Sequence, residues 1–201
     1  HAFRCCGMGS IPDLFVKADV GLEDRGNRRS DVRAPPGFSK VIPVGFAFEQ
    51  APVPMHERPE IDRWILSSLN TLIKNVTRSM DDFEPTNAGR AIETFVDEHL
   101  SNWYVRLCRR RFWKGTYTDD KIAAYQTLYE CIETIARLMA PIAPFFCDQL
   151  FRNLNGLTKR FDATSIHHID FPKADPTKMD AALETRMQLA QDICSLVLSI
   201  R

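Results

Sequence analysis

Residues 59–80 read PEIDRWILSSLNTLIKNVTRSM, and this stretch decides the fold class. Its apolar residues recur at the i, i+3, i+4, i+7 spacing that places side chains on one face of a helix. They are Ile61, Trp64, Ile65, Leu69, Leu72, Ile73, Val76 and Met80. Pro59 suits a first helical turn, because its missing N–H would have no partner there. The pattern therefore predicts an amphipathic helix from about Pro59 to Met80 whose apolar face packs in a core.

Three further stretches carry the same helical period. The first runs from Thr86, a plausible N-cap, to about Trp113, and its stripe includes Ala88, Ile92, Phe95, Val96, Leu100, Trp103 and Leu107. The second starts near Asp119 or Asp120, is kinked or broken by Pro141 and Pro144, and continues to Leu154. The third opens at Asp175-Pro176 and carries Met179, Leu183, Met187, Ala190, Cys194 and Val197. Together they predict an all-α fold, a helical bundle of four to five long helices.

The first 56 residues show no sustained period and are rich in turn signals such as Ala34-Pro35-Pro36-Gly37. We therefore expect two regions, an irregular segment at 1–56 and a helical domain at 57–201. The chain also lacks an initiator Met, which favours a fragment of a longer protein.

The composition excludes several classes of protein. The 201 residues include 26 basic and 26 acidic residues, so any surface for a polyanion must be local. No run of 18 apolar residues and no signal peptide is present, which indicates a cytoplasmic protein without a membrane partner. The six cysteines form no C-x-x-C and no zinc spacing, so we expect reduced, buried or half-buried thiols and no metal site.

Residues 100–114 read LSNWYVRLCRRRFWK and place five cations within nine residues. Such a cluster among aromatic residues is an electrostatic site for a polyanion such as nucleic acid. The alternative is a solvated helix end, where cations complement the helix dipole and pair with Asp119 or Asp120 across the turn. Arg110 lies closest to the apolar stripe and is the expected structural member of the cluster.

The candidate residues for contacts to phosphates are Arg106, Arg109, Arg110, Arg111 and Lys114. Trp103 falls on the core stripe, whereas packing and base stacking are equally compatible with Trp113 at the helix end. Asn102 could contact a base edge or cap a local turn. No set of residues suggests catalysis, and the adjacent His167 and His168 would point to opposite faces of an extended segment rather than share a metal.

Several segments resemble the isoleucyl-tRNA synthetase family, in the order that the family has them. They are ERPEIDRWILSSLN at 57–70, TNAGRAIETFVDEHLSNWYVR at 86–106, RRRFW at 109–113, LMAPIAPFF at 138–146 and SIHHIDFP at 165–172. The class I synthetases for valine, leucine and methionine share this helical architecture. The resemblance implies the C-terminal anticodon-binding domain of the family, which grips the anticodon stem-loop of tRNA(Ile).

The resemblance also implies what lies outside this chain. The whole enzyme would be an aminoacyl-tRNA ligase that uses ATP and Mg²⁺ to join isoleucine to tRNA. The HIGH-type and KMSKS-type motifs that hold ATP are absent here, so catalytic and editing domains of the same polypeptide would supply the chemistry. The fragment alone is expected to be non-catalytic and without a cofactor. Residues 1–45 depart from the family, and a valine-type synthetase domain or a helical protein-interaction scaffold remain the alternatives.

Overall fold

The computed structural model describes residues 52–113 and 118–200, and all regular structure within these ranges is helical. The long helices are α3 (Glu60–Asp81), α4 (Pro85–Thr94), α5 (Arg106–Trp113), α6 (Asp119–Met139), α7 (Pro144–Thr158) and α8 (Ala181–Ser199). A π-helix, η5 (Phe95–Val105), joins α4 to α5, and short 3₁₀ turns occur at η4 (Met55–Glu57), η6 (Ile166–His168) and η7 (Pro176–Lys178). The all-α prediction is confirmed. The predicted irregular segment lies almost entirely outside the described residues.

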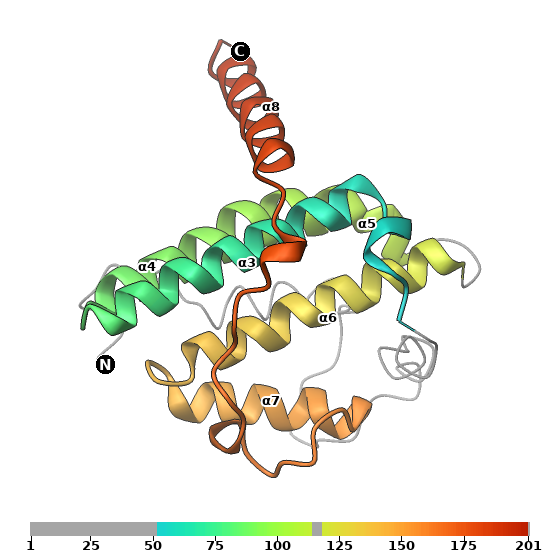
Figure 1. Ribbon diagram of the computed structural model, residues 1–201. Coiled ribbons are helices and arrows are strands. Elements are labelled where there is room, and N and C mark those ends of the chain that lie inside the picture. The colour runs from blue at the N-terminus through green and yellow to red at the C-terminus, as the bar shows by residue number, and fades with distance from the viewer. Residues whose placement is uncertain (1–51, 114–117, 201) are drawn as a thin grey trace, which may run out of the picture.

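The bundle is layered, as Figure 1 shows. Helix α3 packs along α4, α6 lies against α3, and α7 packs on the outer side of α6. Helix α8 contacts α3 and projects away from the other helices. None of the described helices is both long enough and apolar enough to cross a membrane.

The core forms along the apolar face of α3. Trp64, Ile65, Leu69 and Val76 are all buried there. Each large apolar side chain that is fully buried contributes roughly 1.5–3 kcal/mol to folding. The helix begins at Glu60 and ends at Asp81, so the predicted bounds of 59–80 are correct to within one residue at each end.

The proline break that the sequence predicts after α6 is also present. Helix α6 ends at Met139, and Pro144 occupies the first turn of α7, where its missing N–H has no intrahelical acceptor to lose. The four residues between them form a turn, in which the amides of Ile142 and Ala143 both donate to the carbonyl of Met139. This turn reverses the chain and lays α7 against α6.

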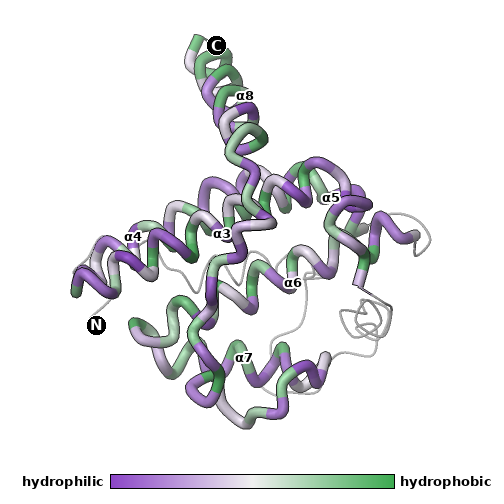
Figure 2. Tube along the Cα trace, viewed as in Figure 1, coloured by the Kyte–Doolittle hydropathy of each residue, from purple (hydrophilic) through white to green (hydrophobic). Residues whose placement is uncertain are grey.

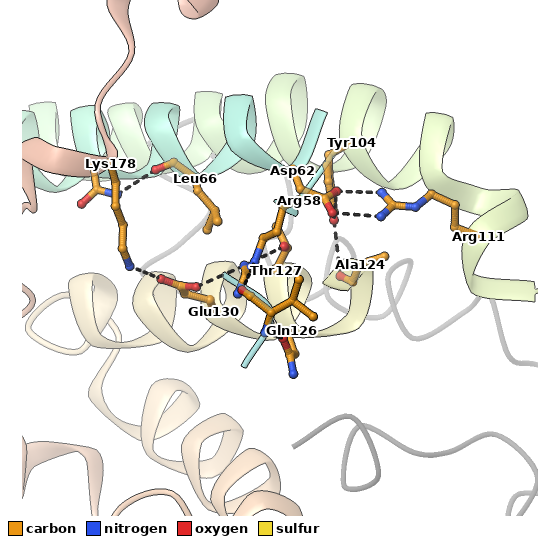
Figure 3. Close-up of polar contacts among 12 residues, drawn as sticks. Arg58, Asp62, Leu66, Tyr104, Arg111, Ala124, Gln126, Thr127, Glu130 and Lys178 are labelled. Carbon is orange, nitrogen blue, oxygen red and sulfur yellow. Dashed lines mark hydrogen bonds and ion pairs between the residues drawn. The ribbon is translucent and has the colours of Figure 1, made fainter. Parts of the chain in front are cut away.

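Polar side chains tie the start of the described chain to α6. Arg58 donates from Nη1 to Thr127 Oγ1 at 2.9 Å and from Nε to the Val53 carbonyl at 3.0 Å. Glu130 accepts from Lys178 Nζ at 2.8 Å and lies 3.7 Å from Arg58 Nη1 (Figure 3). One carboxylate on α6 therefore faces cations from both ends of the domain.

The last helix begins later than the sequence predicts. Asp175 and Pro176 form only the 3₁₀ turn η7, in which Asp175 caps the Thr177 amide. The long helix starts at Ala181, and Asp180 caps it by accepting from the Leu183 amide at 3.0 Å. The Asp180 amide itself donates to Ser67 Oγ on α3 at 2.7 Å. This tertiary contact fixes the helix start at Asp180, and so the predicted start at Asp175 is wrong.

Helix α8 is packed against the domain only in its first half. Leu183 and Gln191 are buried, and Glu184 accepts from the hydroxyls of Ser67 and Thr71 on α3. Most other apolar residues of the helix are exposed, and Figure 2 shows apolar positions along the projecting helix. The exposed ones are Leu189, Ile193, Leu196, Val197, Leu198 and Ile200. Cys194 is exposed as well, which corrects the expectation that the thiols are buried or half-buried.

Candidate nucleic-acid interface

The π-helix η5 sets which side chains of the cationic segment face the core. Each residue of a π-helix bonds to the fifth residue along, so each turn holds more residues than an α-helical turn does. The buried positions consequently follow a spacing of four, at Leu100, Tyr104 and Cys108. Leu107, which the α-helical template places in the core, is 54% exposed. The predicted core role of Leu107 is therefore wrong, and the π-helix is the reason.

The side chains of this segment that face the core form hydrogen bonds with a buried carboxylate. Asp62 on α3 is 0% exposed, and its Oδ1 accepts from the Tyr104 hydroxyl at 2.9 Å. Arg111 approaches the same carboxylate with both terminal nitrogens, Nη1 to Oδ1 at 2.7 Å and Nη2 to Oδ2 at 2.9 Å (Figure 3). This two-point geometry is the strongest pairing available between arginine and a carboxylate.

Arg111 also connects α5 to the start of α6. Its Nε donates to Asp120 Oδ2 at 3.0 Å, and its Nη2 donates to the Asp120 carbonyl at 2.8 Å. Burial opposes the charge on the guanidinium, but the hydrogen bonds to Asp62 and Asp120 outweigh it and raise the pKa of Arg111 above its ordinary value. The side chain therefore stays charged and joins three helices at one point.

The electrostatics keep Tyr104 neutral. Burial raises the pKa of Tyr104 well above its ordinary value, and the negative charge of Asp62 raises it further. The hydroxyl therefore remains a hydrogen-bond donor to Asp62. The Ala124 carbonyl oxygen lies 3.3 Å from the same hydroxyl, on the α6 side of the cluster.

The structure separates the predicted phosphate contacts into two groups. Arg106, Arg109 and Arg110 are exposed, as is Asn102 one turn earlier. The three arginines follow the spacing i, i+3 and i+4, which brings side chains to one face of an α-helix, and Asn102 lies in η5 just before them. Arg111 is half-buried in its ion pairs instead. Lys114 and the side chain of Trp113 lie outside the described part of the chain.

The structural member of the cationic cluster is therefore Arg111. The sequence favours Arg110 for this role because it lies nearest the α-helical stripe, but Arg110 is exposed, and this expectation is wrong. The predicted pairing across the turn is confirmed for Arg111 and Asp120. Trp103 is half-buried and packs against the core, as its position predicts.

Sequence reasoning does not identify Asp62 and Tyr104 as members of this cluster. One feature of the sequence does indicate that Asp62 is buried. Asp62 precedes Ile65, Leu69 and Leu72 at the spacing of a core-facing stripe. A carboxylate at a core position requires a cation or several donors, because an unpaired buried charge is strongly destabilising. The sequence offers a run of arginines, but it does not show which of them reaches Asp62.

The described residues also bear on the sequence-based expectation for metal ligands. Within the described ranges, no three His, Cys, Asp or Glu side chains gather closely enough to hold a metal ion. His167 and His168 lie on the 3₁₀ turn η6 rather than on an extended segment, and both are exposed.

Comparison with known proteins identifies the family to which this chain belongs. Residues 62–201 match the model of a family described as the anticodon-binding domain of tRNA ligase. The chain belongs to this family. The matched region begins at Asp62 and contains the whole cluster around Arg111 together with the exposed face from Asn102 to Arg110.

Relatives of this anticodon-binding domain carry the name isoleucine–tRNA ligase. The chain is 57% identical over 157 residues to the one from Bacteroides thetaiotaomicron, an alignment that covers 78% of this chain and 14% of the relative. It is 57% identical over 156 residues to that of Cytophaga hutchinsonii and 47% identical over 156 residues to that of Thermobifida fusca. These cover 78% and 76% of this chain, and 14% of each relative. The chain thus spans about one seventh of the length of the curated relatives that it matches, and the resemblance to isoleucyl-tRNA synthetases is confirmed.

Proposed function

We propose that this chain is the tRNA anticodon stem-loop recognition module of an isoleucine–tRNA ligase. The observation that carries the proposal is the exposed cationic face of η5 and α5, within a region that matches the anticodon-binding family. A stem-loop carries negatively charged phosphates, which bind surface cations, and unstacked bases, whose edges bind polar side chains. A surface that recognises a stem-loop therefore needs both kinds of group close together.

The roles within this face follow from chemistry and exposure. Arg106, Arg109 and Arg110 contact phosphates and set the orientation of the RNA, without reading its sequence. The Asn102 amide, which offers both donors and an acceptor, contacts a base edge. Trp113 and Lys114, whose side chains lie outside the described residues, are the further candidates for base stacking and for a phosphate contact.

Arg111 is assigned a positioning role. Its guanidinium is engaged by Asp62 and Asp120, so a phosphate would have to compete with two carboxylates for it. By holding α5 against α3 and α6, the pair directs the neighbouring arginines toward solvent. The charge that helps fix the interface is therefore distinct from the charges that touch RNA.

The proposal extends to the longer polypeptide. Catalytic and editing domains on the same chain would use ATP and Mg²⁺ to activate isoleucine and transfer it to tRNA(Ile), in the cytoplasm. The described residues supply recognition alone, and the 201-residue chain should not exchange pyrophosphate into ATP. Isoleucine-dependent exchange by the purified chain, free of host enzyme, would contradict this division of labour.

Salt-dependent tRNA binding tests the interface. Arg106→Gln, Arg109→Gln and Arg110→Gln should each weaken binding of cognate and non-cognate tRNA alike. The slope of log K against log salt should become shallower by about 0.7 to 0.9 for each phosphate that the protein no longer neutralises. Arg78→Gln is the matched control, because Arg78 is an exposed helical arginine at the far end of α3.

Three arginine variants with intact helical signal and unchanged slopes would refute the phosphate contacts. Heparin that displaces the chain from tRNA at equal charge concentration, with no preference for folded tRNA, would refute recognition of a stem-loop. A preference for an acidic protein over tRNA would instead favour a protein-interaction scaffold.

A further inference from the structure

Helix α8 carries a second apolar stripe, on the side that faces away from the domain. Leu189, Ile193, Leu196 and Ile200 follow one another at intervals of four, three and four residues. At about 100° per residue these positions share one side of the helix, and the buried Leu183 lies roughly opposite to them. The four side chains of the stripe are between 51% and 86% exposed.

The spacing of this stripe is that of a coiled-coil seam. Alternating intervals of three and four residues define the a and d positions, whose side chains pack into the spaces between side chains of a facing helix. The residue types agree with the spacing, because Ile193 and Ile200 take the a positions and Leu189 and Leu196 take the d positions. Ile at a with Leu at d is the combination that favours two strands.

The charges of α8 restrict what can cover the stripe. Asp192 is the only charged residue between Met187 and Ile200. The phosphates of RNA and the headgroups of an anionic membrane would find no cation along this part of the helix. The stripe therefore suits a surface that is itself apolar and uncharged. The same stripe on a second copy of this chain meets that requirement, since a twofold axis brings identical surfaces together.

The exposed area is sufficient for a reversible pair. Full burial of one aliphatic side chain removes on the order of 100 Å² of apolar surface from water. The four stripe residues and the exposed Val197 at the neighbouring e position would together bury roughly 650 Å² of apolar surface in a pair. Homodimer interfaces are about 65% apolar, so the total is roughly 1,000 Å², the lower limit for a specific interface. We therefore expect dissociation in the micromolar range.

We propose that α8 pairs with α8 of a second copy of this chain, through a seam formed by Leu189, Ile193, Leu196 and Ile200. The Asp180 cap already orders this helix within one chain, so pairing does not require a new helix to form. Figure 1 shows that α8 projects away from the bundle, which leaves its outer side open to a second helix. The seam includes none of the arginines assigned to RNA, so this inference does not depend on the proposed function.

Analytical ultracentrifugation of the 201-residue chain tests the pairing, from low-micromolar to submillimolar concentration and with a reductant that keeps Cys194 from cross-linking. The average mass should rise from that of one chain toward that of two. Leu196→Glu should weaken association at least about tenfold, because two carboxylates would meet in the seam without a cation. Ser195→Glu is the matched control, since it adds the same charge one residue away on the polar side of α8 and should leave the mass profile unchanged.

The wild-type mass decides the question without relying on any variant. A single-chain mass at every concentration would overturn the proposal and leave the stripe to a different apolar segment, and growth beyond two chains would overturn it as well. Association that survives Leu196→Glu, with helical circular dichroism intact, would exclude this seam. Arg106→Gln should not alter the pairing, and weaker pairing in that variant would assign the contact to the cationic face instead.

Discussion

Replacing Asp62 by Asn should destabilise the domain strongly, because it removes the negative charge from a side chain that is 0% exposed. The Asn side chain has nearly the same shape but turns an N–H donor toward the Arg111 guanidinium. Breaking a buried ion pair on one side typically costs about 3–5 kcal/mol. Arg111 keeps its bonds to Asp120, so the lower end of that range applies here.

Thermal unfolding followed by helical circular dichroism measures this loss. For a domain of this size, 1 kcal/mol shifts the midpoint by about 2–4 °C, so Asp62→Asn should lower it by about 6–12 °C. Asp162→Asn is the matched control, because Asp162 is an exposed aspartate outside the helices, and surface changes stay within about 0.5 kcal/mol. Equal midpoints for the two variants would refute the structural role of the pair.

A double-mutant cycle separates the pair from its surroundings. Asp62→Leu combined with Arg111→Met removes both charges and leaves apolar groups of similar size. The double variant should be more stable than the sum of the single losses predicts, by about 0.5–3 kcal/mol, because neither charge is left buried alone. Strict additivity would show that the two side chains do not interact energetically, whatever their distance.

Three shorter predictions concern other parts of the domain. Burial lowers the pKa of His99 in the folded chain below its ordinary value of 6.5, so just below pH 6.5 the unfolded chain binds more protons than the folded one. The free energy of unfolding should therefore fall as the pH drops below 6.5. His99→Gln should remove this part of the pH dependence of the unfolding midpoint. Burial raises the pKa of the Cys108 and Cys131 thiols and that of Cys147 to about 12, so an alkylating reagent followed by peptide mass spectrometry should modify the exposed Cys194 before these three. Asp180→Ala should cost about 0.5–2 kcal/mol in thermal unfolding through loss of the α8 cap, and no change would show that the cap is dispensable.

The sequence predicts the helices of this domain well and their faces less well. Apolar spacing locates α3 and α6, and prolines locate the break before α7, because both signals are local. The start of α8 depends instead on Ser67, which receives the Asp180 amide from 113 residues away. A local capping signal cannot register such a contact, and so Asp175 is an equally good start by sequence alone.

The candidate site depends on a feature that periodic templates do not contain. An α-helical stripe through Leu100 continues to Leu107, whereas the π-helix carries the buried face through Tyr104 to Cys108 and leaves Leu107 exposed. The segment contains no Pro, and its amino-acid composition does not distinguish a π-helix from an ordinary amphipathic α-helix. The sequence therefore identifies the cationic cluster but not which of its members is structural.

Arg110 and Arg111 differ in what their side chains meet. Their side chains are chemically identical and adjacent in sequence, yet one is exposed and the other is held by two carboxylates. What distinguishes them is the position of Asp62 on the core stripe of α3, since a buried carboxylate must be met by a cation from a facing helix. A core-facing acid opposite a run of basic residues is thus an informative signal. It indicates that at least one member of the run faces inward, and that the members exposed to solvent are the candidates for contact with a ligand.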